Sequence, residues 1–198
     1  MERLTHVIPT KEHQIAGIEY IQEHLDYHSE INGSGGLDRY IDNYDAWLAK
    51  LEYDRNYIAD DKRVPAETYY LVREEDNKIV GMINIRLSFN PRLQECGGHI
   101  GYGIRPSERQ KGYNKINLYL ALKRCQELGI ENVYLDCDID NPGSYKTMEA
   151  LGGIRIKEYE SKYHEGKIYR YIINVNESIE NNKETYEPKI LRKIKGEN

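Results

Sequence analysis

Hydrophobic residues recur along this chain with two different periods, and each period predicts one kind of element. Alternation of apolar with small or polar residues, or a short apolar run, predicts strands, which we expect at residues 3–8, 68–73, 79–88, 100–104, 133–137, 154–163 and 167–175. Apolar residues three and four positions apart predict helices, which we expect at residues 10–25, 38–53, 115–128 and 143–151.

The hydrophobic pattern ends near residue 175. The remaining residues, 176–198, are mostly polar. We therefore expect a single domain over residues 1–175 and a polar C-terminal tail over residues 176–198, either frayed or packed on a neighbouring subunit. Earlier in the chain, the Gly-Ser-Gly-Gly segment at residues 33–36 interrupts the helical pattern and predicts a flexible loop.

Residues 98–128 contain a strand, a basic turn and a helix in close succession. Pro106 ends the predicted strand because proline has no N–H for the ladder. The turn that follows carries Arg109, Lys111 and Gly112, and helical spacing begins soon after it. Backbone N–H groups at a helix N-terminus, beside cationic side chains, favour a bound phosphate or pyrophosphate.

The turn Arg109–Asn114, with the sequence Arg-Gln-Lys-Gly-Tyr-Asn, resembles the Q/R-x-x-G-x-G/A loop of the GCN5-related N-acetyltransferases (GNAT), which binds the pyrophosphate of acetyl-CoA. The resemblance covers residues 67–175, because Asn141–Ser144 and the Gly152-Gly153 pair follow at the family's spacing. Asn114 departs from the family, in which Gly or Ala is usual. Asparagine tolerates unusual backbone angles, so we expect the loop to form.

The resemblance implies an α/β (α+β) fold, with a mixed, mostly antiparallel sheet of six or seven strands and helices on both faces. It also implies acetyl-CoA as cosubstrate. The backbone near Gly103 and Ile104 would face the pantetheine arm and the thioester, and Asn141 and Ser144 would contact the pantetheine. The pyrophosphate would lie on the turn, against Arg109, Gln110, Lys111, Gly112, Tyr113 and Asn114. The alternative for Arg109 and Lys111 is that they are ordinary solvent-exposed loop residues and do not bind the cofactor.

Two positions bear on proton transfer. Relatives often carry a tyrosine seven residues after the asparagine, but here that position is Met148, whose thioether cannot donate a proton. Tyr145 shares roughly the same helix face and is the candidate acid, with packing or cofactor contact as the alternative.

His99 stands where many relatives place a Glu and is the candidate base, because its ordinary pKa is near 6.5. A structural strand-end histidine is the alternative, with Glu95 and Asp136 as reserve bases.

These residues predict direct transfer of an acetyl group from acetyl-CoA to a primary amine of a small molecule or antibiotic, in a ternary complex. A protein or peptide amine is the alternative acceptor. A non-catalytic acyl-CoA-binding sensor is the alternative from another class, and Met148 motivates it. Acceptor identity depends on the groove beside residues 29–36 and the predicted turn at 164–166.

Composition argues against several other classes. A formal net charge of -5 disfavours nucleic-acid binding. The chain has three cysteines and no C-x-x-C pair, which predicts neither a disulfide framework nor a zinc site. His24 and His28 are four residues apart but have no third ligand nearby, so we expect no metal. No apolar run approaches the length of a membrane span, so we expect a cytoplasmic protein without a membrane partner. A homodimer is expected from the family's habit and from the polar tail, which would need a surface to pack on.

Overall fold

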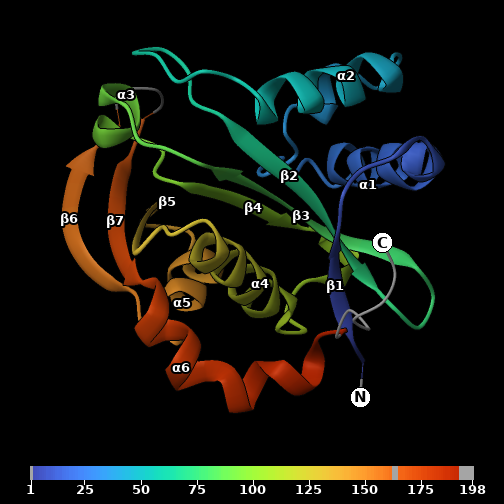
Figure 1. Cartoon of the computed structure of the whole chain (residues 1–198). Helices are drawn as coiled ribbons and strands as arrows, with labels where there is room; N and C mark the ends of the chain where they lie inside the picture. Colours follow the sequence, from blue (N-terminus) through green and yellow to red (C-terminus); the bar gives the residue numbers. More distant parts are fainter. Residues whose placement is uncertain (1, 162–164, 192–198) are drawn as a thin grey trace.

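Two antiparallel sheets frame the molecule (Figure 1). The computed structural model describes residues 2–161 and 165–191. The first sheet contains, in order, β1 (Leu4–Val7), β2 (Ala66–Arg73), β3 (Lys78–Arg86) and β4 (Ile100–Ile104). The second contains, in order, β5 (Asn132–Asp138), β7 (Lys167–Asn174) and β6 (Ile154–Glu160). The predicted α/β class and antiparallel pairing are confirmed, and the described strands divide between two sheets.

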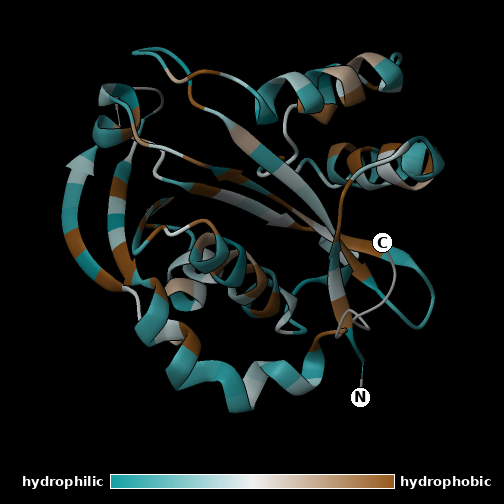
Figure 2. Cartoon of the chain, viewed as in Figure 1, coloured by the Kyte–Doolittle hydropathy of each residue, from teal (hydrophilic) through white to brown (hydrophobic). Residues whose placement is uncertain are grey.

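Helices cover both faces of the first sheet, as predicted (Figure 1). One face carries α1 (Gln14–Asp26) and α2 (Tyr44–Arg55), and the other carries α4 (Tyr113–Glu127). Beside α4 lie α5 (Pro142–Ala150) and α6 (Val175–Tyr186), while α3 (Pro91–Glu95) is a short helix before β4. Because β2 and β3 are covered on both sides, most of their residues are buried. In Figure 2, β2 is nevertheless largely pale with a teal segment, because it carries Glu67, Thr68, Tyr69 and Tyr70 among its residues.

Strand β4 meets the second sheet at its start and separates from it toward its end. The His99 N–H donates to the Tyr134 carbonyl of β5 at 2.6 Å. Gly98 comes so close to β5 that a Cβ there would collide with the same carbonyl. Among the described residues, no ladder continues the pairing of β4 with β5. The divergence leaves the free edge of β4 available to a ligand.

The expected tail after residue 175 begins instead as helix α6. The Asn174 side chain caps it by accepting the Glu177 N–H at 3.0 Å. Ser178 donates its hydroxyl to the Leu151 carbonyl at 2.6 Å, and Tyr186 packs against Tyr119 of α4 with ring centroids 5.2 Å apart. A few buried residues at helical spacing are therefore enough to hold a mostly polar segment on the core. Residues 192–198 lie outside the described part of the chain.

Two further predictions change in detail. The helix expected at 38–53 begins at Tyr44, because the Asn43 side chain caps it by accepting the Ala46 N–H. The turn expected at 164–166 includes His164, which lies outside the described residues. Within the described residues, no helix is both long and apolar enough to span a membrane.

Candidate functional site

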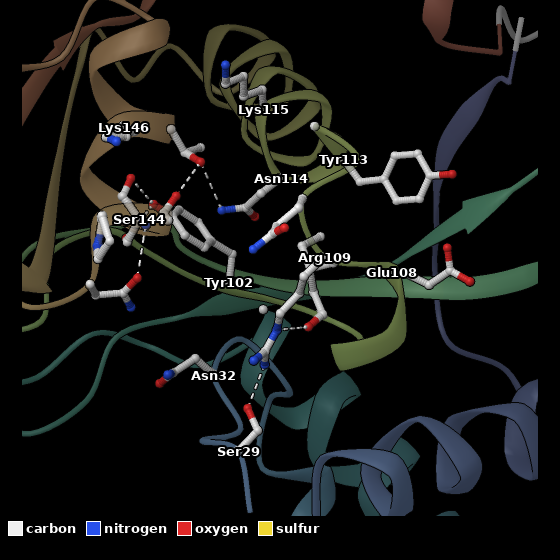
Figure 3. A pocket seen from close by; sticks show the side chains of 18 of the residues that line it. Ser29, Asn32, Tyr102, Glu108, Arg109, Tyr113, Asn114, Lys115, Ser144 and Lys146 are labelled. Carbon is white, nitrogen blue, oxygen red and sulfur yellow. Dashed lines mark hydrogen bonds between the residues drawn. The ribbon is translucent and has the colours of Figure 1, made fainter. Parts of the chain in front are cut away.

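A cavity of about 720 Å³ opens where β4 leaves the second sheet (Figure 3). Its walls come from the end of β4, the N-termini of α4 and α5, and the segment that follows α1. All the cofactor residues predicted from sequence line it except Lys111, which borders an adjoining cavity. The lining consists of Ser29, Glu30, Asn32, Tyr102, Gly103, Ile104, Glu108, Arg109, Gln110, Gly112, Tyr113, Asn114, Lys115, Asn141, Pro142, Gly143, Ser144, Lys146 and Thr147.

The backbone of β4 faces this cavity at alternate residues. The Arg105 N–H donates to the Val80 carbonyl of β3 at 2.9 Å. One residue earlier, the Ile104 carbonyl points away from β3 and accepts a bond from Arg109 Nε at 3.1 Å. Because successive residues of an antiparallel strand turn their polar groups to opposite sides, Tyr102 and Ile104 present their N–H and C=O groups to the cavity.

The turn before α4 has the geometry of an anion site. Gln110 and Gly112 both adopt left-handed backbone angles, with φ of 63° and 81°. A side chain at Gly112 would meet no atom within 4 Å but would be strained by that angle. Gly112 is the residue before the first turn of α4, where N–H groups lack helical partners and favour an anion; that of Lys115 donates to the Gly112 carbonyl at 3.2 Å.

Glu108, which is itself buried, holds the turn through bonds with three cations. Its carboxylate accepts bonds from Arg73 at 3.0 Å, Lys78 at 2.6 Å and Lys111 at 2.7 Å. Burial alone would raise the pKa of Glu108, but the bonds from these three cations outweigh it and hold that pKa at about 2. Lys111 is therefore bound to Glu108, which explains why it lies beside the cavity and not in its lining.

Arg109 links the turn to the opposite wall. Besides its bond to Ile104, it donates from Nη2 to the Ser29 hydroxyl at 2.5 Å (Figure 3). Glu23 of α1 makes a second link, since it accepts the Ser107 N–H at 2.8 Å and a bond from Arg105 at 3.2 Å. The segment after α1 is thus tied to the turn that follows β4.

His99, the candidate base, lies outside the cavity lining. It is 6% exposed, stacks on Phe89 with ring centroids 4.5 Å apart, and accepts the Tyr134 N–H at Nδ1 at 3.1 Å. Burial, with a smaller effect of Arg86 and Arg170, lowers the pKa of His99 to about 4. The imidazole is therefore neutral at pH 7 and fastens the start of β4 to β5.

The reserve base Asp136 is also a buried structural group. Arg170 donates to both of its oxygens at 2.7 Å, and Tyr159 donates to Oδ2 at 2.8 Å. The Gly97 N–H donates to Oδ2 as well, at 2.5 Å. With its lone pairs occupied in this way, Asp136 is held as an anchor for the chain before β4.

Tyr145, the candidate acid, also lies outside the lining. Its ring packs edge-to-face against Tyr169, with centroids 6.1 Å apart, and Met148 is buried in the core. The tyrosine that does line the cavity is Tyr102, whose hydroxyl lies 2.8 Å from Ser144 Oγ. Sequence reasoning used Tyr102 only as part of a strand pattern. Its position as the only polar side chain of β4 was the available signal.

Cys137 supplies no thiolate nucleophile, and the described residues form no cluster that could hold a metal. Cys137 of β5 is buried, and burial raises the pKa of its thiol to about 11. Histidine, cysteine and carboxylate side chains gather nowhere in that part of the chain into a group that could hold a metal.

Comparisons with known proteins agree with this geometry. A sequence model of the Acetyltransferase (GNAT) family matches residues 37–173, which is well over half of the chain. A search among curated protein sequences finds no match.

Solved structures share the fold at low sequence identity. The ribosomal-protein-S5-alanine acetyltransferase from Vibrio fischeri has a TM-score of 0.65 at 11% identity, covering 89% of this chain and 95% of that chain. The microcin C7 self-immunity acetyltransferase MccE, in complex with acetyl-CoA and AMP, has a TM-score of 0.64 at 11% identity, with coverages of 87% and 92%. A spermidine N-acetyltransferase SpeG chimera from Vibrio cholerae and hSSAT has a TM-score of 0.60 at 14% identity, with coverages of 89% and 98%.

Proposed function

The chain belongs to the GNAT family of acetyltransferases, and from this premise we propose that it transfers the acetyl group of acetyl-CoA to a primary amine of a small molecule. The observation that carries the proposal is the free edge of β4 beside the turn 109–114, both within one cavity. A strand edge can bind an extended amide-bearing arm, and the turn can bind the pyrophosphate at the arm's other end.

Each part of the cavity has a distinct role in this proposal. The N–H groups at the start of α4, with Arg109 nearby, bind the pyrophosphate. The backbone of Tyr102 and Ile104 pairs with the pantetheine amides, which orients the thioester along β4. A backbone N–H at this edge also stabilises negative charge on the thioester oxygen as the amine attacks. Asn141 and Ser144, at the N-terminus of α5, line the other side of the arm.

The acceptor enters from the side of the segment that follows α1. Glu30 and Asn32 line the cavity there, and Glu30 is exposed. A carboxylate at the mouth attracts a cationic amine through screened electrostatics. This favours a small polycationic or amino-bearing molecule over the alternative acceptor, a protein or peptide amine. The sensor alternative predicts cofactor binding without turnover.

The experiment is a titration of the protein with acetyl-CoA by calorimetry, followed by a thiol-release screen across polyamines, aminoglycosides, amino acids and short peptides. We expect saturable binding and release with one class of small amine. Release only with peptides would select the alternative acceptor. Binding without release from any amine would select the sensor.

A pair of glycine variants tests whether the turn binds the cofactor. Gly112→Val places a β-branched residue at φ 81°, and Gly129→Val imposes similar strain at φ 72° at the far end of α4. Gly112→Val should weaken acetyl-CoA binding by about tenfold or more, while Gly129→Val retains wild-type affinity. Equal affinities in the two variants would remove the turn from the site.

A further inference from the structure

The side chain of Tyr102 extends from β4 toward Ser144 of α5 and lines the cavity between them (Figure 3). Its neighbours Gly101 and Gly103 have no side chains, and their Cβ positions would point at residues 32–33 on the other side of the strand. Tyr102 therefore supplies the one polar side chain of β4, beside the same strand edge whose backbone faces the cavity.

The hydroxyl of Tyr102 is held in a defined position. It lies 2.8 Å from Ser144 Oγ, and the Ser144 N–H donates to Asn141 Oδ1 at 3.0 Å. Burial raises the pKa of Tyr102 above its ordinary value, so the hydroxyl stays protonated at neutral pH. A fixed and protonated hydroxyl at the strand edge is a proton source for chemistry beside it.

Other hydroxyls near the cavity are engaged elsewhere. Tyr113 donates to Glu2 at 2.5 Å, and Thr147 donates to the Gly143 carbonyl at 2.7 Å. Tyr145 lies outside the lining. The hydroxyl on β4 is thus the one that combines access to the cavity with a place beside the edge along which the thioester lies in the proposed function.

We propose that Tyr102 is the catalytic acid that protonates the departing thiolate, an inference that rests on the proposed acetyl transfer. The amine nitrogen bonds to the thioester carbon, and the C–S bond breaks with its electron pair on sulfur. The Tyr102 proton passes to that sulfur. The surplus proton on the new amide nitrogen leaves through water and restores the Tyr102 hydroxyl, so a neutral amine and acetyl-CoA give an amide and a free thiol.

The role of Ser144 is to position this acid. Its Oγ shares a hydrogen bond with the Tyr102 hydroxyl, and its backbone is fixed by the cap of α5. The burial that disfavours a charged tyrosinate at Tyr102 also disfavours a charged thiolate placed beside its hydroxyl. A hydrogen bond from Tyr102 is therefore the available means of stabilising the sulfur as the bond to carbon lengthens.

The first test needs no acceptor amine. The pKa of the CoA thiol bound to the protein is measured from thiolate absorbance, with bound desulfo-CoA as the blank. Loss of the Tyr102 hydrogen bond in Tyr102→Phe should raise that thiol pKa by about 1, and Tyr145→Phe should move it less. An unchanged thiol pKa in Tyr102→Phe, or a larger shift in Tyr145→Phe, would overturn the assignment.

The second test uses the best amine from the thiol-release screen. Tyr102→Phe should lower kcat about 100-fold, with the Kd for acetyl-CoA within about twofold of wild type because the ring and the strand edge remain. Ser144→Ala, which keeps the acid but loosens it, should lower kcat by about tenfold, and it serves if Tyr102→Phe fails to fold. A wild type that turns over no amine overturns the transfer itself, whereas normal turnover in Tyr102→Phe overturns only the acid.

Discussion

The two ends of β4 are built in opposite ways. At its start, the strand is joined to β5 through His99 and Tyr134, and the nearby carboxylate is Asp136. At its end, the strand borders the cavity, and the nearby carboxylate is Glu108. The side chains of both carboxylates are buried, and both accept bonds from an arginine. The two ends differ in the other groups that these carboxylates contact.

At the closed end, charged side chains bond to the backbone. Asp136 accepts the Gly97 N–H, Arg170 donates to the carbonyls of Leu93 and Gln94, and Arg86 donates to those of Gly97 and Gly98. These bonds occupy the polar groups of the chain that leads into β4. The closed end is therefore fastened, with little left for a ligand.

At the open end, the carboxylate of Glu108 bonds to cationic side chains, although Arg109 and Glu23 also bond to the backbone there. Glu108 accepts from Arg73, Lys78 and Lys111, and Lys111 remains 48% exposed. Backbone N–H groups at the start of α4 favour an anion, apart from that of Lys115, which donates to the Gly112 carbonyl. A strand can thus serve as an anchor at one end and as a binding edge at the other: the carboxylate at the closed end also binds the backbone, whereas the one at the open end binds cationic side chains.

Breaking the closed end should have the largest effect on stability. Asp136→Asn leaves Arg170 buried without its anion, so we expect the free energy of unfolding to fall by about 3–5 kcal/mol, measured by urea denaturation. Glu158→Gln removes an exposed pair with Lys167 and should change stability little. Similar losses in the two variants would mean that the Asp136–Arg170 pair stabilises the protein no more than an exposed ion pair does.

Acidification should weaken the same end. The pKa of His99 in the folded protein, about 4, lies below its ordinary 6.5. The contribution of the neutral His99 ring to the free energy of unfolding is therefore complete above pH 6.5 and is lost as the pH falls toward 4. It amounts to at most about 3 kcal/mol. His99→Gln should flatten the dependence of unfolding free energy on pH. Part of the slope should remain, because burial also lowers the pKa of His6 to about 4.

The pH dependence of the acetyl-transfer rate in the same variant, His99→Gln, distinguishes a catalytic base from a structural histidine at this position. Because the ring lies outside the cavity lining, His99→Gln should retain the shape of the wild-type pH–rate profile. Loss of one limb of that profile, with stability unaffected, would make His99 the base.

At the open end, a ligand should compensate for a lost carboxylate. Glu108→Gln leaves Arg73, Lys78 and Lys111 without their shared anion, so we expect the free energy of unfolding to fall by about 2 kcal/mol. Acetyl-CoA phosphates near these cations should then raise the melting temperature more than in wild type. Asp136→Asn is the matched comparison, and acetyl-CoA should stabilise it no more than wild type. An equal ligand effect in both variants would contradict the comparison.

The smallest expected effect lies at the acceptor side. Glu30→Gln should raise KM for a polycationic amine by about threefold to tenfold at low salt, with the difference fading at high salt. Affinity for acetyl-CoA should stay unchanged. Glu19→Gln removes an exposed carboxylate on α1 outside the lining and is the control. An increase in KM that persists at high salt would indicate a direct positioning contact.

The binding turn was predictable from sequence because its causes are local. Pro106 ends the strand, Gly112 supplies the left-handed angle, and the apolar spacing of α4 follows directly. Such features act within a few residues, so their order along the chain is enough. The positions of strands and helices followed from periodicity in the same way, whereas the antiparallel pairing and the helices on both faces of the sheet followed from the family resemblance.

Which side chains reach the cavity was not predictable, because the causes are non-local. His99 and Tyr145 had suitable chemistry, but stacking on Phe89 and packing on Tyr169 hold them outside the cavity. Helix α6 likewise depends on a distant surface, since α4 buries its few apolar residues. The sequence by itself determined the strand, the turn and the helix that form the anion site. The tertiary structure decided which side chains reach the cavity, because burial and contact are set by segments far apart in the chain.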